Sequence, residues 1–600
     1  MSTAFSTMTD GRFHHPCRYG ASLVGAHTTR FQLWAPGAGG VEVALERDDG
    51  TRTDVEYLPM HPDGEGHFTL EADCGAGARY RYRIDGAQSV PDPAARAQHK
   101  DVTGPSLVVD PQAYRWRCSD WQGRPWHETV ILEVHAGVAG GFDGLRTRLA
   151  EWASLGITAI ELMPINEFPG ARNWGYDGVL PYAVEASYGP PEALKALIDE
   201  AHALGLMVFL DVVYNHFGPD GNYLPLYAPD FFTGESTPWG DAIDFDRPQV
   251  RQFFIDNALL WLNEYRFDGL RFDAVHAIDN DDFLRDMSRA LRASTGGERH
   301  VHLMLENERN SASLLEQSYD AQWNDDFHNV MHTLLTGEDE AYYADYANHA
   351  TDKLAASLLG GFIFQGQADR RGQPRGEPSG HLAPTAFISF LQNHDQVGNR
   401  ALGDRLINLI DEDRLEAATV LLLLAPMVPM LFMGEEWGER RPFLFFTDHR
   451  EALADDVREG RRSEFAEFSA FKDEKARNAI PDPNDPATFE KSTPAAHSGG
   501  EPEAAMWNTR YMTLLDIRHA EIIPRLPGTR AMGAVPLGKG AVLAHWCMGD
   551  DTVLAIAVNL GRERVAVEVP DGQRLYELGE AESADTLAPG AVRAWLSSHL

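Results

Sequence analysis

Cysteine is scarce in this chain of 600 residues. The four that occur are widely separated and include no Cys-x-x-Cys pair: Cys17, Cys74, Cys118 and Cys547. This spacing predicts neither a disulfide framework nor a cysteine-based zinc site. The chain is too long for a single hydrophobic core, so we expect roughly three to five domains stabilised by packing.

Positive charge and long apolar segments are scarce as well. The chain has 52 Lys and Arg against 90 Asp and Glu, a formal net charge of -38, so nucleic-acid phosphates and anionic membranes would repel it. The longest apolar run, Val420 to Met433, contains two prolines and is too short to span a bilayer. Residues 1–10 lack the basic and apolar pattern of a signal peptide. We expect a cytoplasmic monomer with a neutral substrate and no nucleic-acid or membrane partner.

The two ends of the chain have the pattern of β-domains. Phe31 to Trp34 and Tyr80 to Ile84 alternate in polarity, between turns rich in Gly, Pro and Asp. Such alternation predicts an immunoglobulin-like β-sandwich over residues 1–110. Short β-like runs such as Val553 to Val558 return near the end, so residues 526–600 are predicted to form a small β-domain.

Residues 111–525 alternate short apolar runs with stretches of helical periodicity. Strand–helix alternation implies parallel strands joined by right-handed crossovers. The eight candidate strands begin near Thr129, Ile157, Met207, Gly269, Val301, Ala321, Ala386 and Val428. Eight units over about 400 residues favour an α/β fold of the (β/α)₈ barrel type over an open doubly wound sheet. The polar stretch from Pro481 to Pro502 is interpreted as a surface loop.

Acidic residues stand at the C-terminal ends of four predicted strands: Asp211, Asp273, Glu306 and Asp395. In a (β/α)₈ barrel the catalytic residues come from several strand ends on that same face. One acidic strand end alone is as easily explained by solvent exposure. Four in one barrel favour an active site.

Basic and amide side chains accompany these acids. Arg271 lies two residues before Asp273, so strand periodicity places both on the same face. A guanidinium beside a carboxylate keeps it ionised, as a nucleophile requires, although a simple salt bridge in the barrel is the alternative. Asn215 and His216 follow the third strand, and His394 follows the seventh. These side chains are candidates for hydrogen bonds to sugar hydroxyls.

Aromatic residues alternate with polar ones in the loops after the strands. Residues 173–177 include Tyr176, and residues 322–327 include Trp323, Asp325 and Asp326. Sugar rings pack their C–H faces on aromatic rings, and their hydroxyls need polar partners. A set of carboxylates beside such a cleft is typical of a glycosidase.

The ordered motifs resemble those of the α-amylase superfamily of glycoside hydrolases. They are residues 211–216 (DVVYNH), residues 269–273 (GLRFD), the strand ending at Glu306, and residues 393–395 (NHD). The N-terminal LWAP at residues 33–36 resembles the β-sandwich of glucan-branching and debranching enzymes. Within the superfamily, residues 167–170, 173–178, 322–329, 392–399 and 434–437 resemble malto-oligosyltrehalose trehalohydrolases.

This resemblance implies roles for the acids. Asp273 would be the nucleophile, Glu306 the general acid/base and Asp395 the transition-state stabiliser. The sugar site at the −1 position would be lined by Arg271, His216, His394, Asp211 and Tyr176. Glu308 is an alternative acid, because many relatives have Gly before the catalytic Glu where this chain has Leu305. Glu306 is favoured because it directly follows the apolar strand.

The implied reaction is hydrolysis, with retention, of the α-1,4 bond next to the terminal trehalose of malto-oligosyltrehalose. No cofactor or metal is expected, since Asp211 and Asn215 alone provide too few oxygen ligands for calcium. Asp325 or Asp326 would accept hydrogen bonds from trehalose, with Trp323 or Phe327 as the wall of the pocket. The alternative is that this loop only caps the strand and the following helix.

Two other functions remain open at this point. An α-glucan branching or debranching enzyme would use the same acids with a different acceptor pocket, and fold alone does not decide between them. A glucan-binding scaffold protein without activity would need damaged catalytic acids. All three acids are present, which disfavours it.

Overall fold

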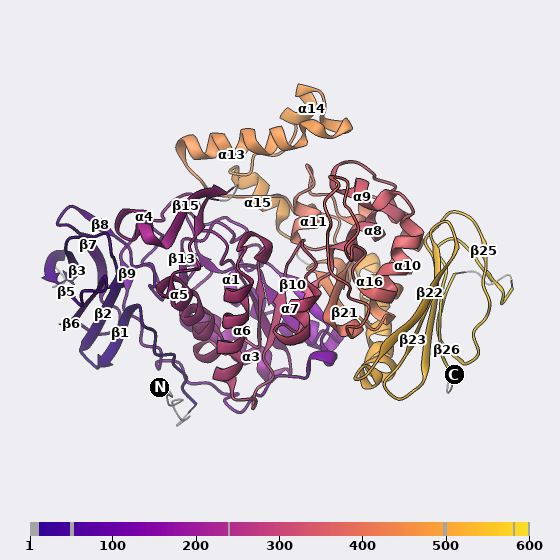
Figure 1. Ribbon diagram of the computed structural model, residues 1–600, viewed down its shortest axis with the longest axis horizontal. Helices are drawn as coiled ribbons and strands as arrows, with labels where there is room; N and C mark the ends of the chain where they lie inside the picture. Colours follow the sequence, from indigo (N-terminus) through magenta and orange to yellow (C-terminus); the bar gives the residue numbers. More distant parts are fainter. Residues whose placement is uncertain (1–10, 49–52, 238–239, 496–500, 580–582, 598–600) are drawn as a thin grey trace.

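The computed structural model describes residues 11–48, 53–237, 240–495, 501–579 and 583–597. A barrel lies in the middle of an elongated molecule, with the N-terminal strands on one side of it and the C-terminal strands on the other (Figure 1). Within these residues, no helix is long and apolar enough to cross a membrane.

The N-terminal strands form two sheets that face each other, as the alternating pattern predicts. The first sheet has the order β1 (Gly20–Gly25), β2 (Thr28–Trp34), β6 (His67–Asp73), β5 (His61–Pro62). The second has β4 (Thr53–Pro59), β3 (Val41–Asp48), β7 (Arg79–Ile84) and β8 (Gln88–Val90), with β9 (Ser106–Leu107) paired to β7. Phe31 and Tyr80 are fully buried, and their ring centroids lie 4.9 Å apart between the sheets. Alternate residues of both sheets therefore fill one core.

Eight parallel strands close into a barrel, which confirms the predicted fold class. Their order is β10 (Ile131–Val134), β11 (Ala159–Leu162), β14 (Met207–Val212), β17 (Gly269–Phe272), β18 (His302–Leu305), β19 (Ala321–Trp323), β20 (Phe387–Phe390) and β21 (Val428–Phe432). The last strand pairs with the first, Met430 being the partner of Ile131. Each predicted strand lies where the structure has one.

The barrel interior changes from apolar to ionisable along the strands. The apolar part contains Ile131, Ala159, Met207, Phe209, Met304, Ala321, Trp323, Ile388, Phe390, Val428 and Met430. Two residues further along the strands, Glu133, Glu161, Asp211 and Arg271 are each at most 1% exposed. Charged side chains are this deeply buried only where they are paired or neutral, so this layer marks the functional end of the barrel.

Helices cover the barrel, and their ends follow the local sequence. α3 (Pro191–Ala203) begins with Pro191, where the missing N–H costs no hydrogen bond. α6 (Asp281–Thr295) is capped by Asn280, which accepts from Phe283 N, and ends at Gly296 with φ of 61°. α5 (Pro248–Leu259) continues into the π turn η3 (Leu260–Glu264). Other long helices are α8 (Asp325–Thr336), α10 (Ala350–Gly360), α12 (Glu412–Leu424) and α16 (Pro502–Ile517).

The segment after β21 adds helices above the barrel, where α13 (Glu451–Glu464) and α14 (Glu474–Asn478) project (Figure 1). The prediction of a loop from Pro481 to Pro502 is wrong for its first half, which contains α15 (Pro486–Ser492). Asp485 caps this helix by accepting from Ala487 N, and Thr488 is buried. Pro and Asp here begin a helix, although their abundance resembled a loop. Residues 496–500 lie outside the described residues.

The C-terminal strands form a sheet with the order β22 (Arg530–Gly538), β23 (Ala541–Cys547), β24 (Val553–Asn559), β28 (Val592–Ser597), β26 (Gln573–Leu578). The short strands β25 (Val565–Ala566) and β27 (Thr586–Leu587) pair beside it. Arg414 of α12 donates to the carbonyl of Leu560 at 2.9 Å, which fixes the sheet to the barrel helices.

Candidate active site

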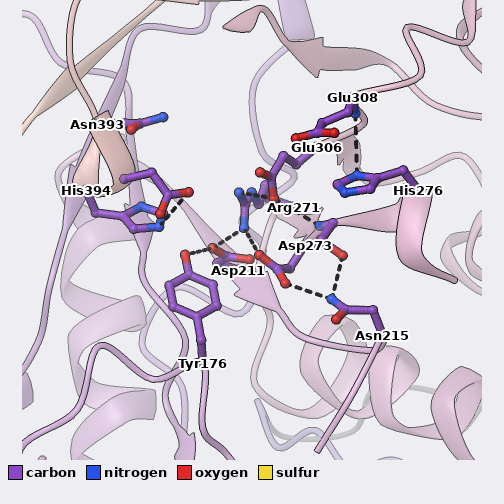
Figure 2. Close-up of polar contacts among 12 residues, drawn as sticks. Tyr176, Asp211, Asn215, Arg271, Asp273, His276, Glu306, Glu308, Asn393 and His394 are labelled. Carbon is purple, nitrogen blue, oxygen red and sulfur yellow. Dashed lines mark hydrogen bonds and ion pairs between the residues drawn. The ribbon is translucent and has the colours of Figure 1, made fainter. Parts of the chain in front are cut away.

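Arg271 is the centre of a buried charged cluster at the C-terminal end of the barrel. Its Nη1 donates to Asp211 Oδ2 at 2.6 Å and to Asp273 Oδ1 at 2.9 Å, and its Nη2 donates to Glu306 Oε2 at 2.6 Å (Figure 2). The guanidinium carbon lies 4.0 Å from the centre of the Trp323 ring. Three of the four predicted acids, at the ends of three adjacent strands, therefore share one cation.

Burial divides these acids into two groups. Asp211 is 1% exposed, whereas the side chains of Asp273 and Glu306 are 12% and 17% exposed. Burial raises the pKa of Asp211 to about 7, although the Arg271 guanidinium lowers it. Burial alone would lower the pKa of Arg271, but the Asp211 and Glu306 charges raise it well above its usual range. Arg271 is thus a permanent cation anchored by Asp211, and Asp273 and Glu306 face the opening.

The backbone after β17 brings Asp273 and Glu306 together. Asp273 directly follows the strand, and its Oδ2 accepts from Asn215 Nδ2 at 2.7 Å. Ala274 has φ of 40°, an uncommon conformation for a residue with a side chain, and its N–H donates to Glu306 Oε2 at 2.9 Å. The strained turn therefore directs a backbone donor at Glu306.

The structure separates Glu306 from Glu308. Glu306 belongs to the central cluster, whereas Glu308 is exposed and its backbone N–H lies 3.4 Å from His276 Nδ1 (Figure 2). A general acid must lie within reach of the nucleophile's side of the sugar. The geometry favours Glu306 for this role.

His394 and Asp395 begin α11 (His394–Gly398), after β20. Nδ1 of His394 lies 2.5 Å from Glu133 Oε1, and its Nε2 lies 3.4 Å from Asp395 Oδ2. Burial alone would lower the pKa of His394, but the Asp395 and Glu133 charges raise it to about 9. The Tyr176 ring stacks on the imidazole with centroids 5.0 Å apart, and its hydroxyl donates to Asp211 at 2.6 Å. Tyr176 thus links His394 to the Arg271 cluster.

Some residues that are predicted to contact the sugar form hydrogen bonds to other protein groups. Nδ1 of His216 lies 2.5 Å from Asn215 Oδ1, and its Nε2 lies 2.9 Å from the Tyr176 carbonyl. Asn215 in turn contacts Asp273, and Trp323 is 1% exposed beneath Arg271. Asn215, His216 and Trp323 therefore contact other residues of the site. The sequence analysis predicts instead that they contact the sugar.

Asp325 and Asp326 differ although they are neighbours on α8. Asp326 is 1% exposed, and its oxygens accept from five donors: Asn310 Nδ2, Ile363 N, Phe364 N, Tyr346 Oη and Arg375 Nη2. Phe327 is also buried, at 2%. The prediction of a sugar contact therefore does not hold for Asp326, whose carboxylate is fully used by the fold. Asp325 is half-buried; burial raises its pKa well above its usual range, and the Glu306 and Asp395 charges add to this.

Sequence reasoning missed three residues of the site. Glu133 and Glu161 lie side by side on β10 and β11, and both are 1% exposed. His276 follows Asp273 by three residues and lies beside Glu308 (Figure 2). A glutamate inside an apolar strand, as in Ile131 to Val134, was the available signal for the first two.

Asp211 and Asn215, the two possible oxygen ligands for calcium, are both hydrogen-bonded within the protein. Asp211 Oδ2 accepts from Arg271 and Tyr176, and the Asn215 amide donates to Asp273. In the part of the chain that the structure describes, no group of three or more His, Cys, Asp or Glu side chains is arranged for a metal ion.

Three family models match the N-terminal sandwich, part of the barrel and the C-terminal sheet. They are carbohydrate-binding module 48 (isoamylase N-terminal domain) at residues 18–113, the α-amylase catalytic domain at residues 109–225, and a domain of unknown function, DUF3459, at residues 529–593. A crystal structure of a putative α-amylase from Salmonella typhimurium is 40% identical, with a TM-score of 0.91 over 97% of this chain and 100% of that one. A pullulanase of Paenibacillus barengoltzii, 19% identical with a TM-score of 0.68, shares the fold.

Full-length relatives identify the family more closely. The malto-oligosyltrehalose trehalohydrolase of Deinococcus radiodurans is 40% identical over 582 residues, which are 93% of each chain. Those of Mycobacterium tuberculosis and Saccharolobus solfataricus are 38% and 39% identical, over 90% and 72% of this chain and 94% and 78% of their own lengths. With the barrel, the acid cluster and this similarity over nearly its whole length, the chain belongs to the family of malto-oligosyltrehalose trehalohydrolases.

Proposed function

We propose that this enzyme hydrolyses the α-1,4-glucosidic bond next to the terminal trehalose of malto-oligosyltrehalose, and so releases trehalose. Asp273 is the nucleophile, Glu306 the general acid/base and Asp395 the transition-state stabiliser. The observation that carries this proposal is the single guanidinium of Arg271, which holds Asp273 and Glu306 side by side at the barrel opening. Relatives over nearly the full length of the chain carry the name of this activity.

The first step forms a covalent intermediate. Asp273 attacks the anomeric carbon while Glu306 gives its proton to the leaving oxygen of the trehalose unit. Arg271 donates to Asp273 Oδ1 and Asn215 donates to Asp273 Oδ2, so both oxygens of the nucleophile are held in place for attack. Both donors that contact the Glu306 carboxyl in the described residues reach Oε2, which leaves Oε1 to carry the transferable proton.

The second step restores the enzyme. Glu306, now ionised, removes a proton from water, and the oxygen of that water displaces Asp273 from the anomeric carbon. Two displacements retain the α configuration. Asp395, beside the His394 imidazolium, faces the positive charge that develops on the sugar ring in both transition states. No cofactor enters this scheme.

Asp325 is our candidate for trehalose recognition. It is half-buried, near Glu306 and Asp395, whereas its neighbour Asp326 is fully bonded within the protein. A carboxyl group at the mouth of the site accepts or donates hydrogen bonds to the hydroxyls of a compact disaccharide.

Products distinguish this function from its alternatives. Malto-oligosyltrehalose and maltohexaose are incubated side by side with the enzyme, and trehalose and the anomer first released are followed by NMR. We expect trehalose and an α-anomeric malto-oligosaccharide from the first substrate, and much slower cleavage of the second. Equal cleavage of both, formation of α-1,6 branches, or cleavage of a branched glucan would identify another member of the superfamily. Binding without any cleavage would identify a scaffold protein.

We also propose that the enzyme is a cytoplasmic monomer acting on malto-oligosyltrehalose and maltodextrins. Its four cysteines are free thiols, which a reducing compartment maintains. Size-exclusion chromatography with light scattering tests the oligomeric state: a mass near 66.5 kDa is expected, and twice that mass would contradict it. Fractionation of source cells tests the location.

A further inference from the structure

Glu133 is a buried acid that the mechanism above does not use. It lies on β10, the first barrel strand, and is 1% exposed. Both of its oxygens contact one residue: Oε1 lies 2.5 Å from His394 Nδ1, and Oε2 accepts the backbone N–H of His394 at 2.9 Å. Two contacts to ring and backbone fix both the position and the rotation of the imidazole.

The other ring nitrogen of His394 faces the catalytic acids. Nε2 lies 3.4 Å from Asp395 Oδ2 and makes no shorter hydrogen bond among the described residues. Because Glu133 accepts at Nδ1, that nitrogen carries a proton. Nε2 carries one as well when the ring is charged, and then holds Asp395 in place. Contacts from Glu133 to His394 and from His394 to Asp395 thus connect the barrel interior to the proposed sugar site.

We propose that Glu133 is a positioning residue for the reaction, which keeps His394 as an imidazolium and thereby holds Asp395 oriented toward the −1 sugar. The inference rests on the proposed function, in which Asp395 stabilises the transition state. Asn399 Nδ2 donates to the other oxygen of Asp395, Oδ1, at 3.0 Å. Without the imidazolium, Asp395 Oδ2 would lose the contact that orients it.

The charge on His394 results from all groups around it. Asp395 and Glu133 raise its pKa to about 9 against the effect of burial, and Arg271 acts in the opposite direction. Glu161 on β11 and His135 after β10 are the other titratable neighbours, and Tyr176 stacks on the ring. Burial raises the pKa of Glu161 well above its usual range, and neither of its oxygens has a hydrogen-bond partner in the described residues. Apart from Asp395, Glu133 is therefore the buried acidic side chain that contacts His394.

Glu161 provides a matched control for Glu133. The two are register partners on adjacent strands, and both are 1% exposed. Glu161, however, has no hydrogen-bond partner on either oxygen in the described residues, whereas Glu133 has two contacts to His394. Glu133→Gln and Glu161→Gln thus make the same substitution in the same layer of the barrel, but only Glu133→Gln alters a carboxyl group that contacts His394.

The first test is the pH dependence of kcat/KM for malto-oligosyltrehalose in three proteins. In the wild type we expect activity to fall as pH rises through about 9, the pKa of His394. In Glu133→Gln this alkaline limb should move down by about one pH unit or more, with kcat lowered about 10- to 100-fold and KM little changed. Glu161→Gln should keep the wild-type limb. An unmoved limb in Glu133→Gln, or equal movement in both variants, overturns the proposal.

The second test does not depend on activity. The protein is labelled with [¹³C-ε1]histidine, the His394 signal is assigned by its loss in His394→Gln, and its titration is followed by NMR. It should titrate near pH 9 in the wild type and lower in Glu133→Gln. Glu133→Asp keeps the charge, and should titrate near the wild type even if Glu133→Gln fails to fold. Titration near the ordinary histidine value in the wild type contradicts the proposal. An enzyme that releases no trehalose but passes this titration would refute the proposed function alone.

Discussion

Arg271 Nη2 donates to Glu306 Oε2 at 2.6 Å, across the gap between adjacent strands β17 and β18. This contact places the carboxyl of Glu306 on the cation that also holds Asp273. Glu308, two residues further on, is exposed and lies beside His276. The two glutamates are therefore distinguishable by experiment.

Glu306→Gln should remove the group that gives and takes the proton. We expect kcat to fall by about 10²- to 10⁴-fold and the pH profile to lose the limb that the general acid gives it, because Gln does not ionise, while the fall near pH 9 assigned to His394 should remain. Glu308→Gln should leave the bell intact. Kinetics with malto-oligosyltrehalose between pH 4 and pH 10 measure both, and the reverse result would transfer the role to Glu308.

Asp273→Asn should stop turnover while the substrate still binds. The amide keeps the shape of the side chain but does not attack the anomeric carbon, so kcat should fall by orders of magnitude. Isothermal titration should give a dissociation constant similar to the wild-type KM. More than about a tenth of the wild-type kcat would refute the assignment of the nucleophile.

Asp325→Ala should lower the preference for the trehalose-ended substrate. Losing a hydrogen bond to a bound hydroxyl costs about 1–3 kcal/mol, measured as the ratio of kcat/KM for malto-oligosyltrehalose over the matching maltodextrin. Equal loss for both substrates would show that trehalose is recognised elsewhere.

Asp326→Ala is the contrasting variant. It leaves five donors, one of them the Arg375 guanidinium, without their shared acceptor. We expect the free energy of unfolding to fall by about 3–5 kcal/mol, as when one partner of a buried ion pair is removed. Urea unfolding measures this. Wild-type stability together with a loss of trehalose selectivity would reverse the roles that we give to the two residues.

The stability of the enzyme should depend on His394 in a defined pH range. Its pKa is raised from an ordinary value of 6.5 to about 9 in the folded protein. The stabilisation is therefore fully present below pH 6.5 and is lost as pH rises through 9. The difference in unfolding free energy between wild type and His394→Gln should shrink by roughly 3 kcal/mol between pH 6 and pH 10. A difference that stays constant over this range would contradict the raised pKa.

The barrel could be predicted because its strands are short, apolar and evenly spaced. Each of the eight begins within two residues of its predicted start, as for Thr129 and Ile131. The same pattern predicted four acids near strand ends: in the structure Asp211 is the penultimate residue of β14, Asp273 and Glu306 directly follow β17 and β18, and Asp395 lies in α11 after β20. Local sequence carried this information, since each acid lies at or shortly after the end of its own strand.

Contacts between distant residues could not be predicted from the pattern. Asp325 and Asp326 are identical in type and adjacent, yet only the second is surrounded by donors from residues 310 to 375. Glu133 is bound to His394, which is 261 positions away. His216 was predicted to meet the sugar, whereas its ring nitrogens lie against Asn215 and Tyr176. Each of these outcomes depends on how the loops fold over the barrel.

The pairing of the last barrel strand with the first affects how the protein is made. On the ribosome Glu133 is synthesised 261 residues before His394, and β21 follows later still. The strands of the N-terminal sandwich pair only with one another, whereas β10 has an open edge until Val428 to Phe432 emerge. Glu133 meanwhile lacks its imidazolium, and a chain that stops before Val428 never closes its barrel. Premature termination should therefore yield aggregation-prone fragments without activity, because the site is assembled from both ends of the barrel.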